Sequence, residues 1–330
     1  MNTPYYSGII TNYVCTAACR HCMFGSSPSC PKDFITSDEA ERTAALLREA
    51  GTTSVHIGGG EPFMNFTALL TLIEALNRHN IAVDYIETNA FWAKDDGIVK
   101  KRLKELSKRG VTSVMISADP FHIEYVPLNR VINLARHLNE EGFDYFIWQE
   151  RFLRRLLKLE HNRTYNRKEL EGILGKNYVA DTAREYGVGM NGRALAIASE
   201  IYKKQSYKAF LNSPPCRDIM RPQHCHFDLY GNAIPAGCPG LSIDTQEYLY
   251  ENIPEKKYPV IALLVKKGVG ALYSYAAERG FVPDDGGYPT KCAFCYALRS
   301  YLIKNAPSDD LSPACFYENI DKTLSEEEDS

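Results

Sequence analysis

The chain lacks a long apolar run and a strong excess of charge of one sign, and each absence excludes a class of protein. Its 330 residues are 45% hydrophobic and 24% charged, with a formal net charge of -3. This balance gives no overall electrostatic footprint for nucleic acid, and nothing in it indicates a collagenous, disordered or membrane-spanning chain. The start lacks a basic region followed by an apolar run, which a secretory signal would have. We therefore expect a soluble, cytoplasmic protein with one large core and a smaller appendage.

Cysteine is missing from the long middle of the chain. The ten cysteines divide into four between residues 15 and 30 and six between residues 216 and 315. This division predicts two cysteine-based sites rather than one. A disulfide framework fits poorly, because the chain is well above the length of disulfide-dependent mini-domains.

The first group contains Cys15, Cys19 and Cys22, separated by three and two residues. Three thiolates at this spacing suit an iron-sulfur cube with one iron left open, and an open iron suggests that a small molecule completes the coordination. A zinc site would need a fourth ligand, and His21 lies between two of the cysteines and is a poor candidate. A ferredoxin-type run is disfavoured because its closing Cys-Pro, at Cys30, follows a gap of seven. We rank the open cluster ahead of zinc, and zinc ahead of disulfides.

Apolar runs alternate with helical patterns from residue 5 to about residue 200. The pattern predicts strands over 8–14, 54–57, 81–87, 112–117, 144–148 and 193–197, and helices over 37–50, 66–78, 95–109 and 128–141. Six parallel units joined by right-handed crossovers predict an α/β fold, a partial (β/α)6 TIM barrel, with the chemistry at the carboxyl ends of the strands. Residues 1–205 would form this barrel, 206–320 a small C-terminal α+β extension, and the acidic residues 321–330 a disordered tail.

A glycine-rich turn, Gly58-Gly-Gly-Glu-Pro62, follows the second expected strand. Three glycines permit unusual torsions and close approach of a ligand, although such a run alone is more often just a tight turn. With the cysteine triplet one strand earlier, the chain resembles the radical S-adenosylmethionine (radical SAM) family. The resemblance implies that the triplet holds a 4Fe-4S cluster bound to S-adenosylmethionine. It also implies that Gly59, Gly60 and Glu61 hold the amino group of that cofactor.

Further strand ends continue the resemblance. Ser117 and Asp119 end the fourth strand, where radical SAM enzymes place polar groups against the ribose, and Arg193 lies in a segment that resembles the one passing the adenosine. His21 takes the place of the family's aromatic ring near the adenine, and Asn89 is assigned to the cofactor with these residues. Purely structural roles stay open for these residues. Ser117 and Asp119 could be turn formers, His21 a surface histidine, and Asn89 part of a turn with an aromatic pair packed behind it.

Three short segments, 22–28, 88–92 and 117–122, are similar to the radical SAM peptide epimerases of the epipeptide type. The second cysteine group resembles the twitch or shortened SPASM extension, which carries an auxiliary 4Fe-4S cluster. This resemblance implies four ligands, Cys216, Cys238, Cys292 and Cys295, with Cys225 and Cys315 as candidates to replace one of them. It also implies a short hairpin over residues 227–235. By itself, the Cys-x2-Cys pair could equally be half of a zinc knuckle.

The chain departs from the epimerases directly after this hairpin. Ala236 and Gly237 occupy the places where those enzymes carry two adjacent cysteines, one a ligand and one a thiol that returns a hydrogen atom to the radical. Cys238 or Cys225 would then be the hydrogen donor, or the protein is not an epimerase. The basic segment 151–158 is interpreted as a solvated helix face rather than a docking site for an acidic peptide.

The resemblance as a whole implies an enzyme that cleaves S-adenosylmethionine to a 5'-deoxyadenosyl radical and abstracts a hydrogen atom from a substrate. Epimerisation of a ribosomally synthesised peptide is expected first, and oxidation or cross-linking next. The alternatives are a radical SAM enzyme acting on a small metabolite, such as a sugar or amino acid, and a non-catalytic, zinc-stabilised binding module. An electron donor such as flavodoxin or ferredoxin is an implied partner, whereas membrane and nucleic-acid partners are not expected.

Overall fold

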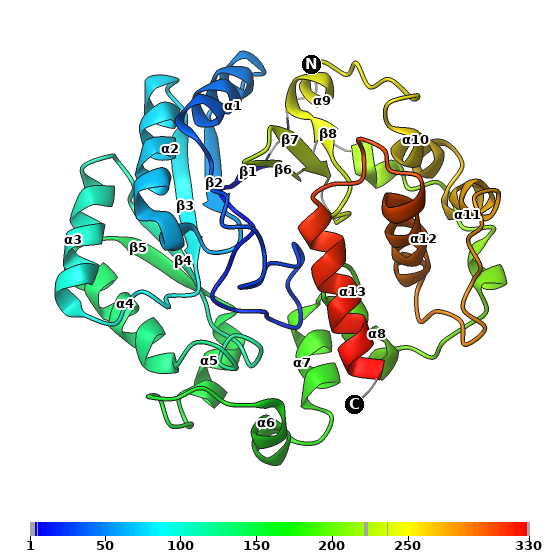
Figure 1. The fold of residues 1–330 in the computed structure, drawn as a ribbon. Coiled ribbons are helices and arrows are strands. Elements are labelled where there is room, and N and C mark those ends of the chain that lie inside the picture. The colour runs from blue at the N-terminus through cyan, green and yellow to red at the C-terminus, as the bar shows by residue number, and fades with distance from the viewer. Residues whose placement is uncertain (1–3, 5, 221–223, 236, 329–330) are drawn as a thin grey trace.

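A mixed sheet forms the centre of the protein (Figure 1). The computed structural model describes residues 4, 6–220, 224–235 and 237–328. Within these residues the sheet has eight strands in the order β5-β4-β3-β2-β1-β6-β7-β8, parallel from β5 to β6 and antiparallel from β6 to β8. The strands are β1 (Tyr6–Ile10), β2 (Ser54–Gly58), β3 (Ala82–Thr88), β4 (Ser113–Ser117), β5 (Asp144–Trp148), β6 (His224–Asp228), β7 (Asn232–Pro235) and β8 (Ile243–Asp244).

Helices alternate with the first five strands and cover the outer side of the sheet (Figure 1). They are α1 (Ser37–Glu49), η1 (Pro62–Asn65), α2 (Phe66–Arg78), α3 (Asp96–Ser107) and α4 (Leu128–Glu140), followed by α5 (Glu150–Leu156), α6 (Arg167–Leu174), α7 (Tyr178–Tyr186) and α8 (Ala194–Ile201). The side chain of Asn65 accepts from the Ala68 N–H at the start of α2, and Leu69, Leu72 and Leu76 bury one face at helical spacing. These local signals explain why the predicted helices are confirmed to within a few residues.

The expected strand over 193–197 is wrong, because this segment begins helix α8. Its Ala-Leu-Ala composition favours a helix, and periodicity alone cannot separate a short buried strand from a buried helix. The sixth parallel strand is instead β6, which pairs with β1 on the side away from β2. The α/β class with a parallel core is thus confirmed, but the sixth strand comes from beyond residue 205. The sheet therefore continues across the predicted domain boundary.

The second half of the chain adds a hairpin and a set of helices beside the sheet (Figure 1). The predicted hairpin is β6–β7, where Oδ1 of Asp228 accepts from the N–H groups of Tyr230 and Asn232 at 3.0 Å each. The helices are η2 (Tyr207–Phe210), η3 (Arg217–Met220), α9 (Thr245–Leu249), α10 (Pro259–Lys266), α11 (Val269–Ala277), α12 (Lys291–Asn305) and α13 (Ala314–Glu328). Ala236, at the point where the chain departs from the epimerases, lies outside the described residues.

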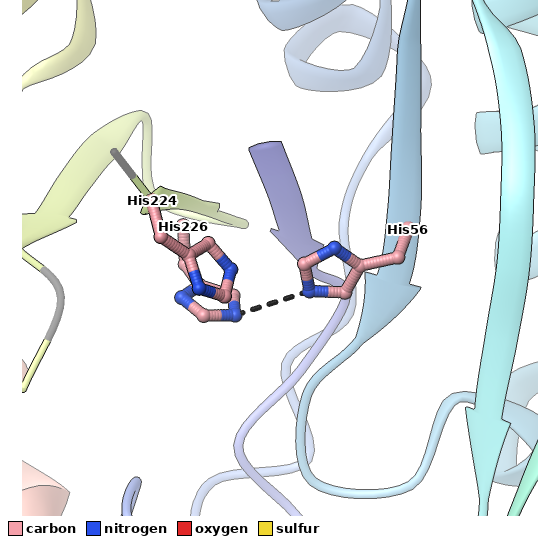
Figure 2. A group of neighbouring side chains, drawn as sticks. All are labelled: His56, His224 and His226. Carbon is pink, nitrogen blue, oxygen red and sulfur yellow. Dashed lines mark hydrogen bonds between the residues drawn. The ribbon is translucent and has the colours of Figure 1, made fainter. Parts of the chain in front are cut away.

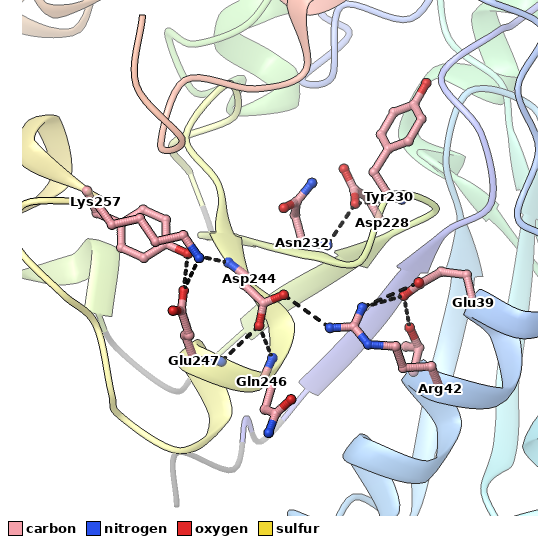
Figure 3. A network of polar contacts seen from close by, with 11 residues as sticks. Glu39, Arg42, Asp228, Tyr230, Asn232, Asp244, Gln246, Glu247 and Lys257 are labelled. Carbon is pink, nitrogen blue, oxygen red and sulfur yellow. Dashed lines mark hydrogen bonds and ion pairs between the residues drawn. The ribbon is translucent and has the colours of Figure 1, made fainter.

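A polar network joins this second half to the first helix (Figure 3). Arg42 on α1 donates to Glu39 at 3.3 Å and to Asp244 at 3.1 Å. Asp244 also caps α9 by accepting from the N–H groups of Gln246 and Glu247. The hairpin glycine Gly231 has φ +80°, and a Cβ there would lie 2.4 Å from Nη1 of Arg42. The turn and the guanidinium therefore pack without room for a side chain.

The C-terminal segment is helical where the structure describes it. Helix α13 continues to Glu328, within the segment 321–330 for which a disordered tail is predicted. Phe316, Tyr317 and Ile320 are buried and Leu324 packs against the core, so this helix has an apolar face to anchor it. Among the described residues, no helix combines the length and apolar character that crossing a membrane requires.

Candidate functional site

A cavity of about 610 Å3 opens at the carboxyl ends of the parallel strands and continues along the inner face of the sheet. The loop after β1 contributes Cys15, Cys19, His21 and Cys22 to its wall. The later strands contribute predicted residues that follow or end them, Gly59, Gly60, Glu61, Asn89 and Ser117. A larger cavity of about 860 Å3 lies among α8, α12 and α13, but it is lined by none of the predicted site residues. The smaller cavity is therefore the candidate site.

The glycine turn lies directly against the cysteine loop. The N–H of Gly60 donates to the carbonyl of Asn12 at 2.7 Å, and the N–H of Glu61 donates to the carbonyl of Val14 at 3.1 Å. A Cβ on Gly60 would lie 2.1 Å from the Val14 oxygen, so any other residue would push the two segments apart. The lack of side chains on the glycines therefore lets the turn pack beside the loop that carries the three thiols.

Arg193 holds the cysteine loop from the other side. Its guanidinium, only 3% exposed as part of the residue, donates to the carbonyls of Cys19 at 3.0 Å, Gly25 at 2.8 Å and Ser26 at 2.9 Å. The preceding Gly192 has φ +54°, and a Cβ there would lie 2.3 Å from the carbonyl oxygen of Met23. Arg193 does not line the cavity. It positions the loop that carries the thiols, which differs from the expected contact with the cofactor.

Two of the thiols receive hydrogen bonds from the ends of neighbouring strands. Nδ2 of Asn89 lies 3.6 Å from Sγ of Cys15 and also donates to Oγ1 of Thr16 at 3.1 Å. His122 forms a side-chain hydrogen bond with Cys19. Its Nδ1 lies 2.8 Å from Oδ2 of Asp119. His122 therefore connects a buried carboxylate to a cysteine sulfur, a role that the motif containing it did not reveal.

Asp119 is fully buried and does not line the cavity, unlike Ser117. Besides His122, its Oδ2 faces Nε2 of His21 at 3.4 Å. Burial raises the pKa of Asp119, but the nearby His122 and His21 more than offset this and hold it at about 2. The carboxylate is thus ionised and already occupied by histidines, so only Ser117 of the predicted ribose-side pair is available to a ligand.

His21 itself lies in the cavity wall with one unused nitrogen. Its ring packs near Phe121 and Tyr186, with centroids 5.1 and 4.8 Å away. Burial lowers its pKa to about 4, so the ring is neutral at neutral pH. Nδ1 has no hydrogen-bond partner among the described residues. A flat neutral ring with a free acceptor or donor is chemically suited to a heteroaromatic base.

Glu61 lies in the wall of the cavity but is largely satisfied from within the protein. Its carboxylate accepts from the Phe63 N–H at 3.1 Å, the Thr88 hydroxyl at 2.9 Å and the Asn89 N–H at 2.8 Å. Burial raises its pKa to about 7, although these donors oppose the shift. Carboxylate oxygens have further lone pairs, so one ammonium can still be accepted. Glu61 therefore ties the glycine turn to the end of β3 and keeps limited capacity for a ligand.

The thiol set fits an iron-sulfur cluster with an open iron. Burial raises the pKa of Cys15 and of Cys19. The nearby thiol of Cys22 raises both pKa values further, and Cys19 also raises the pKa of Cys15. Such thiols are protonated alone and become ligands when a metal displaces the proton. All ten cysteines lie within the described residues, and only Cys15, Cys19 and Cys22 line this cavity. Three cysteine sulfurs would bind three irons of such a cluster, so the fourth iron would keep an open coordination position toward the cavity.

The second predicted set also gathers in space, but elsewhere. Cys216 directly precedes η3, Cys238 follows β7, and Cys292 and Cys295 lie three residues apart on α12. Burial raises the pKa of Cys238 to about 12, and the neighbouring thiols of the other three raise it further while Arg299 lowers it. Nζ of Lys291 lies 3.6 Å from Sγ of Cys216. The four thiols thus lie within electrostatic range of one another, a grouping compatible with the ligands of an iron-sulfur cluster.

The two candidate hydrogen donors do not reach the cavity. Cys225 is fully buried on β6, and its thiol donates to the carbonyl of Ile234 at 3.5 Å. Because strand residues alternate, its neighbours His224 and His226 face the cavity and Cys225 points to the other side. Cys238 belongs with the second set and does not line the cavity either. Cys315 instead pairs with Cys30 through a side-chain hydrogen bond.

Sequence reasoning missed a group of three histidines in the cavity wall (Figure 2). His56 on β2 and His224 and His226 on β6 place ring nitrogens within 4.8 Å of one another. Burial lowers the pKa of each, to about 4 for His56, so the rings are neutral at neutral pH. The His-x-His alternation on a strand was a visible signal for two of them. The third could not be found, because it depends on which strands are neighbours.

The first part of the chain matches a known family model. Residues 9–147 match the family model of the radical SAM superfamily. The match covers less than half of the chain. It contains the cysteine triplet, the glycine turn and the ends of β3 and β4.

The chain is also similar to individual proteins. It is 24% identical over 123 residues to the putative peptide biosynthesis protein YydG of Bacillus subtilis, covering 37% of this chain and 38% of that protein. It is 26% identical over 204 residues to the GTP 3',8-cyclase of Mannheimia succiniciproducens, covering 51% and 58%. The chain thus spans between about a third and three fifths of the curated relatives it matches. Streptococcus suis SuiB bound to its precursor peptide SuiA is similar in fold, with a TM-score of 0.45 and 16% identity over 96% of this chain and 76% of that one.

Proposed function

We propose that this protein is a radical SAM enzyme that cleaves S-adenosylmethionine and abstracts a hydrogen atom from a ribosomally synthesised peptide. The observation that carries the proposal is one cavity lined by the thiols of Cys15, Cys19 and Cys22 together with the glycine turn and Ser117. A 4Fe-4S cluster with S-adenosylmethionine on its open iron supplies, when bound, the electron that breaks a carbon-sulfur bond and so generates the 5'-deoxyadenosyl radical.

The protein's own residues would position the reactants and shield them. Gly59, Gly60 and Glu61 would receive the amino group, Ser117 would bind the ribose, and His21 would lie against the adenine. Arg193 and the Asp119–His122 pair would fix the cysteine loop, so that the thiols hold their geometry during turnover. A buried cavity wall would keep water from a reactive carbon centre.

We infer an oxidative outcome, a dehydrogenation or cross-link, ahead of epimerisation. Inversion needs a hydrogen donor on the face opposite the abstraction, and neither Cys225 nor Cys238 lines the cavity. A second cluster at Cys216, Cys238, Cys292 and Cys295 would supply an electron acceptor instead. The assignment of a peptide rather than a small metabolite is supported by the similarity to YydG, which is described as a peptide biosynthesis protein.

Reaction in heavy water tests this proposal. Anaerobic, reduced enzyme is incubated with S-adenosylmethionine and with peptides encoded by short reading frames beside the gene. We expect 5'-deoxyadenosine together with a peptide that has lost two hydrogen atoms. A peptide that gains one deuterium without other change would replace oxidation by epimerisation. Turnover of small metabolites but of none of the peptides would overturn the peptide assignment, and a colourless protein that binds zinc but no iron would overturn the enzyme.

A further inference from the structure

We propose that His56, His224 and His226 form a binding site for a divalent transition-metal ion, such as Zn2+, in the wall of the cavity. The three rings face one another from two strands that lie on either side of β1 (Figure 2). Binding of the ion does not depend on the proposed radical chemistry. Its role, to hold a carbonyl or carboxylate oxygen of the substrate, rests on the proposed function of the same cavity.

The sheet register creates this site. Gly8, in the middle of β1, is paired with His56 on β2 and with His226 on β6. Residues paired across neighbouring strands project to the same face, and His224 joins them two positions before His226. A Cβ on Gly8 would lie 2.4 Å from Nε2 of His56 and 2.5 Å from Cδ2 of His226. The missing side chain is therefore the space that the imidazoles occupy.

The donor atoms have the spacing that a single ion needs. Nε2 of His56 lies 3.2 Å from Nε2 of His226. Two ligands at about 2.0–2.1 Å from a tetrahedral zinc ion lie about 3.3 Å apart, so this pair needs almost no movement. His224 also offers a nitrogen within the same 4.8 Å group, and its Nε2 has no hydrogen-bond partner among the described residues. Three ring nitrogens within this distance of one another can share one ion.

Neighbouring side chains hold the rings in place. Tyr85 stacks on His56 with centroids 5.2 Å apart and planes 14° apart, and Phe24 meets His226 edge-on at 5.1 Å. His56 also forms a hydrogen bond with the backbone of Ser7, which orients the ring. Fixed rings lose little entropy on binding an ion, so the site is organised in advance.

Charge in the surroundings suits a cation with an open position. Oε1 of Glu87 lies 3.8 Å from Nε2 of His56, and Glu87 also lines the cavity. Three imidazoles with one open position form a donor set that zinc uses in catalytic sites, and imidazole also suits nickel, copper and iron. The open position would face the cavity, where a substrate carbonyl or carboxylate could occupy it.

Zinc binding by the holoenzyme tests the site. The cysteine sites are first filled by anaerobic iron-sulfur reconstitution, and Zn2+ is then added and measured by equilibrium dialysis. We expect one tight equivalent whose X-ray absorption shows nitrogen or oxygen neighbours at about 2.0–2.1 Å, without the sulfur at about 2.3 Å that a cysteine site would give. Absence of saturable binding, or a first shell containing sulfur, would overturn the proposal.

Variants assign the ligands. His224→Gln keeps a polar side chain of similar length on a partly exposed residue and should weaken zinc binding roughly tenfold or more. His161→Gln is the matched control, because His161 is also partly exposed, its Nε2 is hydrogen-bonded to the carbonyl of Leu157, and it does not line the cavity. Equal affinity in both variants would overturn the proposal. S-adenosylmethionine cleavage, measured in parallel, reports on the proposed function separately, so the failure of one is distinguishable from the failure of the other.

Discussion

The two cysteine sites differ in how the chain assembles them. Cys15, Cys19 and Cys22 lie within one loop. This loop lines a cavity and is hydrogen-bonded to the glycine turn and to Arg193. The second set draws cysteines from the residue before η3, from the loop after β7 and from α12, and lines no part of that cavity. The first is a local motif beside a cavity, whereas the second is a tertiary assembly of four cysteines from segments that lie far apart in the sequence.

This difference indicates that the number of sulfur ligands in a site is related to the role of that site. A site with three sulfurs can bind a small molecule, and one with four is suited to electron transfer or to structure. The hairpin β6–β7 connects them, because β6 carries two cavity histidines and Cys238 follows β7. Experiments that separate the two sites therefore decide what the protein does.

The largest expected effect is on S-adenosylmethionine cleavage. Cys19→Ala should abolish it, since only two protein sulfurs would remain for the open cluster. Cys238→Ala should leave cleavage but lose the peptide product, because that thiol belongs to the second set. Release of 5'-deoxyadenosine and the mass of the peptide measure the two steps. Cys225→Ala is the matched control, a buried thiol outside both sites, and should leave both steps intact. Cleavage that survives in Cys19→Ala would break the comparison.

Arg193→Ala should damage the first site without touching its ligands. Three buried carbonyls would lose a charged donor, so we expect a loss of about 3 kcal/mol in the free energy of unfolding and less iron bound at the first site. Urea unfolding and iron analysis measure both. Arg184→Ala removes an exposed ion pair with Asp181 and should change stability by less than about 0.5 kcal/mol. Equal effects in the two variants would show that the hydrogen bonds from Arg193 to the three carbonyls are unimportant.

The sequence predicted the local site better than the assembled one. The helix over 66–78 could be read from the Asn65 cap and its apolar spacing, and the cysteine loop from residues adjacent in the chain. The segment 193–197 could not, because an apolar run of Ala, Leu and Ile is compatible with both a strand and α8. Its true counterpart, β6, is defined by pairing with β1 more than 200 residues earlier.

Roles within the site depended on contacts that spacing does not encode. Asp119 was expected at the ribose, but its partners are His21 and His122. Arg193 was expected at the cofactor, but its guanidinium lies on three carbonyls. The three histidines required the register of Gly8 with both neighbouring strands. The order of the motifs therefore located the cavity, but the role of each residue follows only from its tertiary contacts.

The hairpin that links the two sites should respond to pH. Burial raises the pKa of Asp228 from its ordinary 3.8 to about 6, although Tyr13, Tyr230 and Asn232 donate to it. Between about pH 4 and 6 the folded state binds the extra proton at Asp228, so the contribution of this residue to stability should fall by about 3 kcal/mol as pH rises through this window. Urea unfolding of the apoprotein from pH 4 to 7 measures it. Asp228→Asn should lack this slope, and a parallel slope in the variant would contradict the assignment.

The smallest expected effect separates the two proposed clusters by the hydrogen bonds to their sulfurs. His122 bonds to Cys19, and Nζ of Lys291 lies 3.6 Å from Cys216. Donors to sulfur stabilise the reduced, more negative cluster, so His122→Phe should lower the potential of the first cluster only, and Lys291→Met that of the second only. A hydrogen bond worth about 1 kcal/mol corresponds to roughly 40 mV for one electron. Redox titration followed by electron paramagnetic resonance resolves the two signals. If either variant shifted both potentials equally, the sites would be coupled rather than separate, and the division of labour between an open and a closed cluster would lose its physical basis.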